Sequence, residues 1–418
     1  MLYNMVDRVF IGHMQPAETV GKLALTGVGV CLPIIMVISA FASLMAIGGA
    51  PRASIAEGAG ESEKSERIMG NCLTMLIITA LVLTVLFESF AEPLLLLFGA
   101  SENTIGYALD YMRIYALGTV FVQLTLGMNA YITAQGFATV SMKTVLIGAL
   151  LNTALDPLFI FVFDMGIAGA ALATALSQLV SFCILAWLFL HGRSIVRVHV
   201  RCISKRPGLY GEILLVGFPT ICRQGFASLS SALLNNAAAV YSDAAVAAVT
   251  ISNKVYLLVR SIVIGIGQGF QPVAGYNFGA GDKKRTRQAF WFSVLLGTAV
   301  CIVCAAVISL FPDEIMHFFR DDAEVTRIGR QALLYACAVM PLMGYSTYVN
   351  QLYQCLGFHQ AATLLASCRN GLLYVPLILI LPRMLGLPGV EMSQPGADLL
   401  TFVVSLPFQI WFFRHKLR

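Results

Sequence analysis

The stretch LNTALDPLFIFVFDMGIAGAALATA, residues 151–175, places a carboxylate in one of the most apolar parts of the chain. A charged side chain at the centre of a membrane helix costs roughly 2.5–3.5 kcal/mol, so Asp156 is a functional candidate by default. Asn152 lies four residues earlier and therefore on the same helical face. Pro157 cannot donate to the carbonyl of Thr153, and its ring disfavours a straight helix. The motif predicts a small oxygen-lined site that holds a proton or a bare cation; the alternative is a buried Asp that only caps a kinked helix.

The overall composition is that of a polytopic membrane protein. Of the 418 residues, 58% are hydrophobic and 12% are charged, whereas a typical soluble domain is about 25% charged; the mean hydropathy is +0.79. The net charge of +5 reflects the loops, so we expect the chain to lie in a lipid bilayer and to bind no nucleic acid. Apolar segments of about 20 residues or more predict membrane helices, here at 22–49, 68–90, 105–135, 141–163, 166–190, 209–240, 244–274, 288–311, 326–356, 360–382 and 393–413.

The charges of the loops predict the orientation of the chain. Lys and Arg gather near 52–67, 193–206 and 283–287 and at 414–418, while the intervening loops are poor in them and carry mainly Asp and Glu. Cytoplasmic loops of membrane proteins carry the excess of Lys and Arg. We therefore expect a multi-pass protein of the cell inner (plasma) membrane with a cytoplasmic C-terminus.

The sequence also repeats itself at a spacing of about 220 residues. GGAPRASIAEGAGE at 48–61 matches GFQPVAGYNFGAGD at 269–282, and Asn129 matches Asn350 at the same offset. Both matched loops lie on the basic side, so each half has an even number of spans and the two halves are parallel repeats. Two such halves, with a site between or within them, are a plan typical of secondary transporters.

This repeat predicts the lobes and the fold class. We expect an N-terminal lobe with helices 1–6, a cytoplasmic linker and a C-terminal lobe with helices 7–12, at 1–190, 191–207 and 208–418. The first span of the second half begins near Leu209, and its partner would begin about 20 residues before Met1, so the first helix is expected to be incomplete at its N-terminus. The predicted fold is an all-α polytopic membrane protein with two parallel six-helix repeats, twelve helices in all.

Several motifs, in order along nearly the whole chain, resemble one transporter family. They are YNMVDRVFIG, GNCL, LLNTALDPLFIF, GIAGAALATALSQ and GFQPVAGYNFGAG, which begin at residues 3, 70, 150, 166 and 269. The chain resembles the multidrug and toxic compound extrusion (MATE) transporters, and most of all the bacterial branch with an Asp-Pro in the fifth helix. The resemblance implies a cavity that opens alternately to each side. It also implies an antiporter, driven by H+ or Na+, that exports lipophilic organic cations and drugs.

The resemblance further implies an ion-coupling site in the N-terminal lobe, formed by Asp7, Asn152, Asp156 and Thr174. Asp7 and Asp156 would be the carboxylates that release the ion, and Asn152 and Thr174 would be neutral oxygen ligands. The ion held by these four residues would be either Na+ or a proton. No other cofactor is expected. The C-terminal lobe is expected to hold no carboxylate deep in a span, since its candidates lie near predicted helix ends: Glu212, Glu391 and Asp398. Arg8 departs from the family pattern, in which a small polar residue is commoner after the Asp.

A substrate cavity of this kind should be apolar and aromatic, with a few amides. Its candidate lining residues, each of which alone fits packing as well as contact, are Met36, Phe121, Gln123, Met128 and Tyr131. Arg223 and Gln224 lie within the first helix of the second half. Arg223 either faces the cavity and binds an anionic group, or snorkels or pairs with a neighbouring carbonyl. Lys254 and Arg260 in the next helix have no assigned role.

Two other functions compete with export by a monomeric antiporter of small molecules. A flippase for lipid-linked oligosaccharides would favour a basic cavity, which Arg223, Lys254 and Arg260 would provide, although no extra helices follow the second six. A membrane enzyme such as a prenyltransferase needs clustered aspartates to hold Mg²⁺ and a diphosphate, and the chain has no second acidic cluster to match Asp156 and Asp164. Because H-E-x-x-H and G-x-S-x-G are also missing from the sequence, we do not expect an enzyme.

Overall fold

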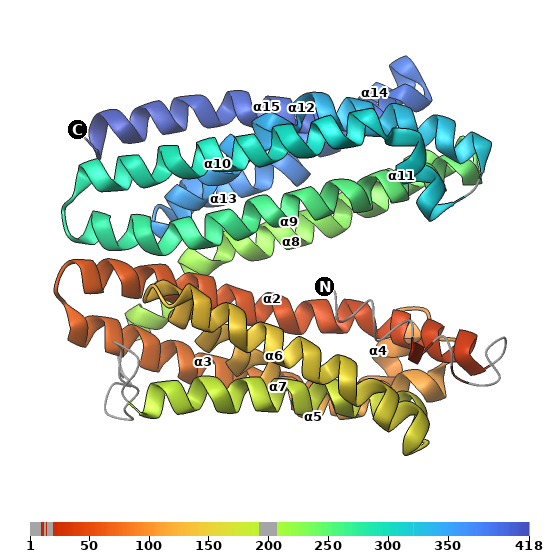
Figure 1. Ribbon diagram of the computed structural model, residues 1–418, viewed down its shortest axis with the longest axis horizontal. Coiled ribbons are helices and arrows are strands. Elements are labelled where there is room, and N and C mark those ends of the chain that lie inside the picture. Colours follow the sequence, from red (N-terminus) through yellow and green to blue (C-terminus); the bar gives the residue numbers. More distant parts are fainter. Residues whose placement is uncertain (1–9, 12–13, 15–19, 192–206, 321, 418) are drawn as a thin grey trace. The chain divides into compact units, whose positions relative to one another are not determined.

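The computed structural model describes residues 10–11, 14, 20–191, 207–320 and 322–417 (Figure 1). Every regular element among these residues is a helix, and none is a strand. Ten of the described helices are long and apolar enough to cross a membrane. The prediction of an all-α polytopic membrane protein is confirmed. The expected truncation of the first helix falls on residues that lie outside the described part of the chain.

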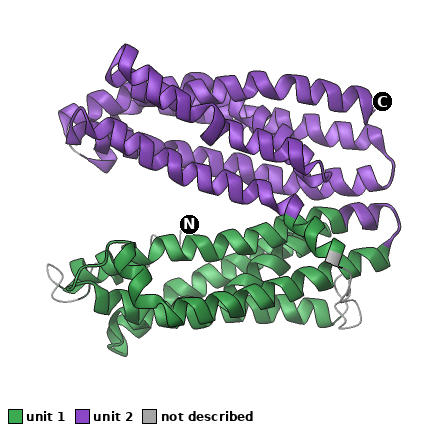
Figure 2. Ribbon diagram, turned by 180° about the vertical axis from the view of Figure 1, so that it is seen from behind, with its two compact units in different colours: residues 1–53, 62–214 green, residues 54–61, 215–418 purple. Residues whose placement is uncertain are grey.

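The helices fall in two compact units, residues 1–53 with 62–214 and residues 54–61 with 215–418 (Figure 2). The first group of helices comprises α2 (Lys22–Gly58), α3 (Ser62–Ser89), α4 (Ala91–Leu97), α5 (Ile105–Ala134), α6 (Ala138–Pro157), the π-helix η2 (Leu158–Val162) and α7 (Gly166–Leu190). The second comprises α8 (Pro207–Ala239), α9 (Asp243–Gly279), α10 (Lys283–Leu310), α11 (Pro312–Phe319), α12 (Ala323–Cys355), α13 (His359–Ser367), the π-helix η4 (Cys368–Leu372), α14 (Tyr374–Leu385) and α15 (Leu387–His415).

The internal repeat extends to the helix bounds. The starts of α2, α3, α6 and α7 fall at residues 22, 62, 138 and 166, and those of α9, α10, α13 and α15 at 243, 283, 359 and 387. All four pairs therefore differ by the same 221 positions. The helix that crosses 141–163 and its counterpart across 360–382 each contain a π-helical turn, η2 and η4. The two halves thus share their helix starts, although the two π-helical turns lie at different points of the span.

The duplicated segments at 48–61 and 269–282 are mostly helix, since α2 and α9 continue beyond the expected helix ends at 49 and 274. Prolines are tolerated in membrane helices because the freed backbone groups find other partners, and α2 and α9 each continue through a proline. The turns follow at Gly60 and Gly281, with φ of +76° and +75°. A left-handed backbone after a helix favours glycine, which explains why both repeats place one there.

Close packing of large side chains on glycines holds each unit together. A Cβ on Gly127 of α5 would lie 2.1 Å from Leu76 Cδ1 of α3, and a Cβ on Gly297 of α10 would lie 2.1 Å from Tyr348 Oη of α12. Leu76 matches Gly297 in the repeat, and Gly127 matches Tyr348. The large side chain and the glycine have therefore exchanged helices. Small residues let membrane helices approach closely, and here either helix of the pair supplies the space.

At Pro157, where a kink was predicted, the α-helix is followed by a π-helix. α6 ends at Pro157 and the chain continues as η2. α7 then packs back against this turn, because a Cβ on Gly169 would lie 2.8 Å from both the carbonyl carbon and the oxygen of Phe159. This contact leaves no room for a side chain and sets α6 and α7 side by side.

Gly169→Ala should therefore destabilise the protein. The new methyl group would meet backbone atoms, so we expect the free energy of unfolding to fall by about 1–3 kcal/mol, the usual cost of overpacking. Gly29→Ala is the matched control, since a Cβ on that glycine of α2 meets nothing within 4 Å. Thermal unfolding of both variants in detergent would measure the effect. Equal melting temperatures for the two would contradict the packing described here.

Candidate functional site

Three of the four residues expected to couple an ion lie together in the first unit. Asn152 and Asp156 are one turn apart on α6, and Thr174 is on α7; they are 2%, 0% and 4% exposed. Asn152 Nδ2 donates to Asp156 Oδ1 at 3.2 Å and lies 3.4 Å from Thr174 Oγ1. The expected proximity of Asn152 and Asp156 is observed, and α7 brings Thr174 to the same amide. Asp7, the fourth residue, and Arg8 lie outside the described residues.

A partly polar cavity of about 110 Å³ adjoins this cluster. It lies among α5, α6 and α7, and its polar lining comprises Thr125, Asn129, Asn152, Thr174, Ser177, Gln178 and Ser181. Asn152 Oδ1 is buried and meets no hydrogen-bond donor among the described residues. A buried acceptor without a donor is costly, so this oxygen is available to a cation or to a water molecule in the cavity.

The donor set suits a proton or a hard monovalent cation. Within the described part of the chain, no group of three or more His, Cys, Asp and Glu side chains could hold a metal ion. The carboxylate of Asp156, the Asn152 carbonyl and the Thr174 hydroxyl are all oxygen ligands, the type that hard cations prefer. The cluster can take up a positive charge at the carboxylate of Asp156, which is fully buried.

The five candidate cavity residues of the first half do not line this polar cavity. Gln123 is fully buried, and its Nε2 donates to Ile38 O at 2.9 Å. Tyr131 is 1% exposed and packs so closely on Gly49 that a Cβ there would lie 2.0 Å from its hydroxyl. Met128 is also buried. All three are packed within the unit.

Phe121 and Met36 are less enclosed. Phe121 is half-buried and its ring lies 6.1 Å from that of Phe182, while Met36 on α2 is 59% exposed. Contact of these five residues with a substrate stays a prediction. Arg223 and Gln224 of α8 are half-buried, and Arg223 lines a cavity in the second unit.

A second buried polar cluster, which the sequence did not reveal, lies in the second unit. Arg369 of η4 donates from Nε to Asp398 Oδ1 of α15 at 2.5 Å, and their side chains are 11% and 3% exposed. The hydroxyl of Tyr256 on α9 accepts from Arg369 and donates to Asp398. The arginine also lies over the Tyr256 ring, 5.4 Å from its centre. Three helices thus meet at one ion pair.

The expectation that this half holds no carboxylate deep in a span is wrong for Asp398. Polar residues near 391–395 lower the local hydropathy and moved the predicted start of the last span to residue 393, but α15 begins at Leu387. Asp398 therefore lies well inside the helix, and Glu391 is also buried, at 7% exposed. The signal that could have revealed the cluster is Arg369 itself, which interrupts an apolar run and so marks a functional or paired site.

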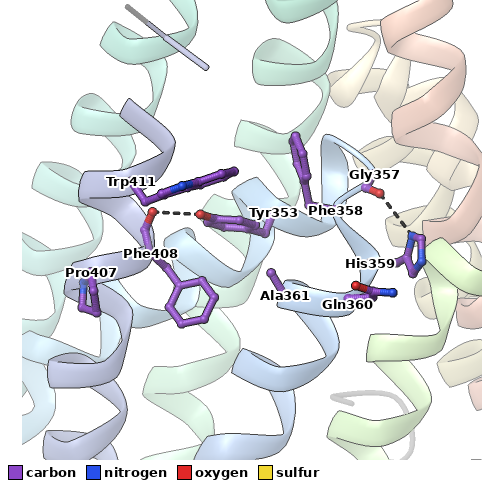
Figure 3. Close-up of a pocket in the computed structure, with 9 residues that line it drawn as sticks. All are labelled: Tyr353, Gly357, Phe358, His359, Gln360, Ala361, Pro407, Phe408 and Trp411. Carbon is purple, nitrogen blue, oxygen red and sulfur yellow. Dashed lines mark hydrogen bonds between the residues drawn. The ribbon is translucent and has the colours of Figure 1, made fainter. Parts of the chain in front are cut away.

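An open aromatic cleft of about 610 Å³ lies at the ends of α12, α13 and α15 (Figure 3). Tyr353 Oη donates to Phe408 O at 2.8 Å, and His359 Nδ1 lies 3.3 Å from Gly357 O. The lining carries no carboxylate, and four of its residues are aromatic: Tyr353, Phe358, Phe408 and Trp411 (Figure 3). This cleft can accommodate apolar groups, but it offers no residue for ion coupling.

Comparison with known proteins identifies the family. The MatE family model matches residues 1–158 and 219–380. The chain belongs to the MatE family. It is a transporter of small molecules and spans the membrane several times, and the prediction that it is not an enzyme is confirmed.

Relatives of this MatE protein match it over nearly its full length. It is 24% identical to "Multidrug export protein MepA" of Staphylococcus haemolyticus (strain JCSC1435) over 417 residues, which cover 100% of this chain and 90% of the relative. It is also 24% identical, over 406 residues, to the protein of the same name from Staphylococcus aureus (strain NCTC 8325 / PS 47), covering 97% and 88%. The solved "Crystal structure of MATE in the bent conformation" has the same fold, with a TM-score of 0.92, 22% identity and coverage of 99% and 91%.

Asp398→Asn should destabilise this MatE protein. The change leaves the Arg369 guanidinium buried without its counter-charge, and removing one partner of a buried pair costs about 3–5 kcal/mol. The double variant Arg369→Met/Asp398→Leu should regain much of that loss, because it buries no lone charge. Thermal unfolding of the single and double variants forms the test. If Asp398→Asn were as stable as the parent protein, the ion pair between Arg369 and Asp398 would not stabilise the fold.

Proposed function

We propose that this MatE protein is an ion-coupled antiporter that exports lipophilic organic cations and drugs. The observation that carries the proposal is the buried set Asp156, Asn152 and Thr174 beside a polar cavity. A carboxylate at such a position is rare and is a mark of ion and proton pathways in membrane helices. The relatives named as multidrug export proteins support outward transport and a wide range of transported drugs.

The mechanism follows from the charge of Asp156. A proton, or Na+ held with the Asn152 and Thr174 oxygens, neutralises the carboxylate and changes how α6 and α7 pack around it. An ion shifts a conformational equilibrium only as far as it binds one state better than the other. Entry of the ion from outside would therefore favour the state that has released the drug, and loss of the ion to the cytoplasm would favour the state that binds it.

The wider arrangement proposed for the protein comes from its loops and repeat. We place it in the plasma membrane as a monomer, with its basic loops and its C-terminus in the cytoplasm. The two homologous halves would act as two lobes around the transported molecule, as in other transporters built from repeats. The ion-coupling role of Asp7 is part of the same proposal.

Asp156→Asn tests this function most directly. The variant keeps the size of the side chain but fixes its charge at zero, so gradient-driven efflux should fall to that of empty vesicles while the protein still inserts. Asp164→Asn is the matched control: it makes the same change in the loop between η2 and α7, on an exposed residue at φ +52° that Asn also tolerates. Purified protein in vesicles, with a proton or a sodium gradient imposed separately, gives the rates and identifies the ion. Efflux at the parental rate by the Asp156 variant would refute the coupling role.

Thr174→Val tests the neutral ligand. The change removes a hydroxyl but keeps the shape, and loss of one interaction with a charged group of about 1.5 kcal/mol corresponds to roughly a tenfold weaker ion affinity. We expect the ion concentration for half-maximal efflux to rise by about that factor. Thr125→Val is the control, since this hydroxyl lines the same cavity but donates to Gln178 O. Unchanged ion dependence in the Thr174 variant would remove that residue from the site.

A lipid flippase remains the second candidate function. The observation that favours it is the presence of three arginines around one cavity of the second unit, because lipid-linked cargo carries phosphate. Movement of a phospholipid-linked oligosaccharide across vesicles that hold the purified protein, without efflux of organic cations, would establish that function instead.

A further inference from the structure

Three arginines from three helical segments line one small cavity in the second unit. Arg223 comes from α8, Arg260 from α9 and Arg369 from η4. Arg223 and Arg260 are half-buried, and Arg369 is 11% exposed. The guanidinium groups lie close enough for Arg369 to repel each of the other two. Such a concentration of positive charge inside a membrane-spanning unit calls for a counter-charge.

The described residues supply only part of that counter-charge. Asp398 pairs with Arg369, and Tyr256 bridges the two. Among the described residues, neither Arg223 nor Arg260 has a carboxylate within ion-pair distance, although Asp398 also attracts Arg260 at longer range. Among the described residues, the carboxylate of Asp398 thus offsets one of the three guanidinium charges. The other two positive charges at the cavity have no counter-charge within ion-pair distance.

Simple snorkelling does not account for these arginines. A snorkelling side chain carries its charge to the membrane surface, whereas Arg223 and Arg260 converge with Arg369 on a shared cavity. Lys254 shows the contrast, since it lies on α9 with Arg260 but is exposed and lines no part of this cavity. Burial of unpaired charges is costly, and an anion in the cavity would offset that cost.

We infer that this cavity is a binding site for an anionic group, a carboxylate or a phosphoryl group carried by a larger organic molecule. Arg223 and Arg260 bind the group, and Asp398 and Tyr256 hold Arg369 in place beside it. Guanidinium groups are planar forks of donors that match carboxylate and phosphate oxygens in pairs. The cavity has about 40 Å³ of space, which is room for a few water molecules and hence for one small charged group, so the rest of the molecule must lie outside it.

The site widens the range of molecules that the protein would carry. Because the arginine cavity binds an anionic group, anionic and zwitterionic amphiphiles become cargo along with the organic cations proposed above. This last statement rests on the proposed export function. Binding of the anionic group does not, because it requires no ion gradient.

Phenyl phosphate is the probe for this site, with benzylamine as a cation of similar size. Full-length protein is placed in nanodiscs of phosphatidylcholine, and binding is measured by calorimetry. We expect phenyl phosphate to bind and benzylamine not to compete with it. Arg223→Gln and Arg260→Gln should each weaken phenyl phosphate at least tenfold, since each removes a charged hydrogen-bond donor. Lys254→Gln, which removes one positive charge from α9 outside the cavity, should leave the affinity unchanged.

Three results would overturn the assignment. They are the absence of phenyl phosphate binding, equal losses in Arg260→Gln and Lys254→Gln, and displacement of phenyl phosphate by benzylamine. Arg223→Lys keeps the charge but not the fork, and it serves as the folded substitute if Arg223→Gln does not fold; an affinity equal to that of the parent would then also count against bidentate binding.

Nanodiscs that contain phosphatidylglycerol identify the source of the anionic group. If phosphatidylglycerol competes with phenyl phosphate for the parent protein, the natural ligand of the site is a lipid headgroup. If it does not compete, the natural ligand is a soluble molecule. The two proposals fail separately. If the parent protein binds no phenyl phosphate but shows intact ion-driven efflux, the anion site alone is overturned. Parental efflux by the Asp156→Asn protein with intact phenyl phosphate binding overturns ion coupling alone.

Discussion

The cost of burying charge among apolar helices governs the arrangement of both units. Each unit holds a carboxylate inside its bundle: Asp156 is 0% exposed and Asp398 is 3% exposed. Water cannot stabilise such a group, so neighbouring side chains must do so. In the first unit an amide donates to the carboxylate, and in the second an arginine forms an ion pair with it. We propose ion coupling at Asp156 because it lies with the Asn152 amide and the Thr174 hydroxyl beside a cavity.

The duplication provides one frame for these two chemistries. Matching helices begin 221 residues apart, and both halves carry a π-helical turn in the same span. In the first half this span presents Asn152 and Asp156, and in the second it presents Arg369. The π-helical turn η2 follows Pro157 in the first half, whereas η4 carries Arg369 at an earlier point of the matching span in the second half. Matching spans of the repeat thus carry groups of opposite charge at different positions, a carboxylate in the first half and a guanidinium group in the second.

Glycine contacts keep this frame tight enough for the sites to work. Gly169 lets α7 approach the backbone of η2, which brings Thr174 to the amide of Asn152. Across the repeat, Leu76 on Gly127 is replaced by Tyr348 on Gly297. The glycine that makes room for the large side chain lies on α5 in the first half and on α10 in the second. Packing of this kind fixes distances between side chains on neighbouring helices, and those distances decide which polar groups can meet.

The sequence by itself determined what depends on neighbours along the chain. Hydropathy located the membrane helices, the repeat was visible from matched letters, and Asn152 and Asp156 were placed on one face because residues four apart on a helix always share it. The tertiary structure decided what depends on residues far apart. Tyr256, Arg369 and Asp398 come from three helices, and Asp398 was misplaced because hydropathy averages each segment alone and put the start of its helix too late. Whether a buried charge is paired or left for a ligand depends on which helices pack together, and only the folded chain contains that information.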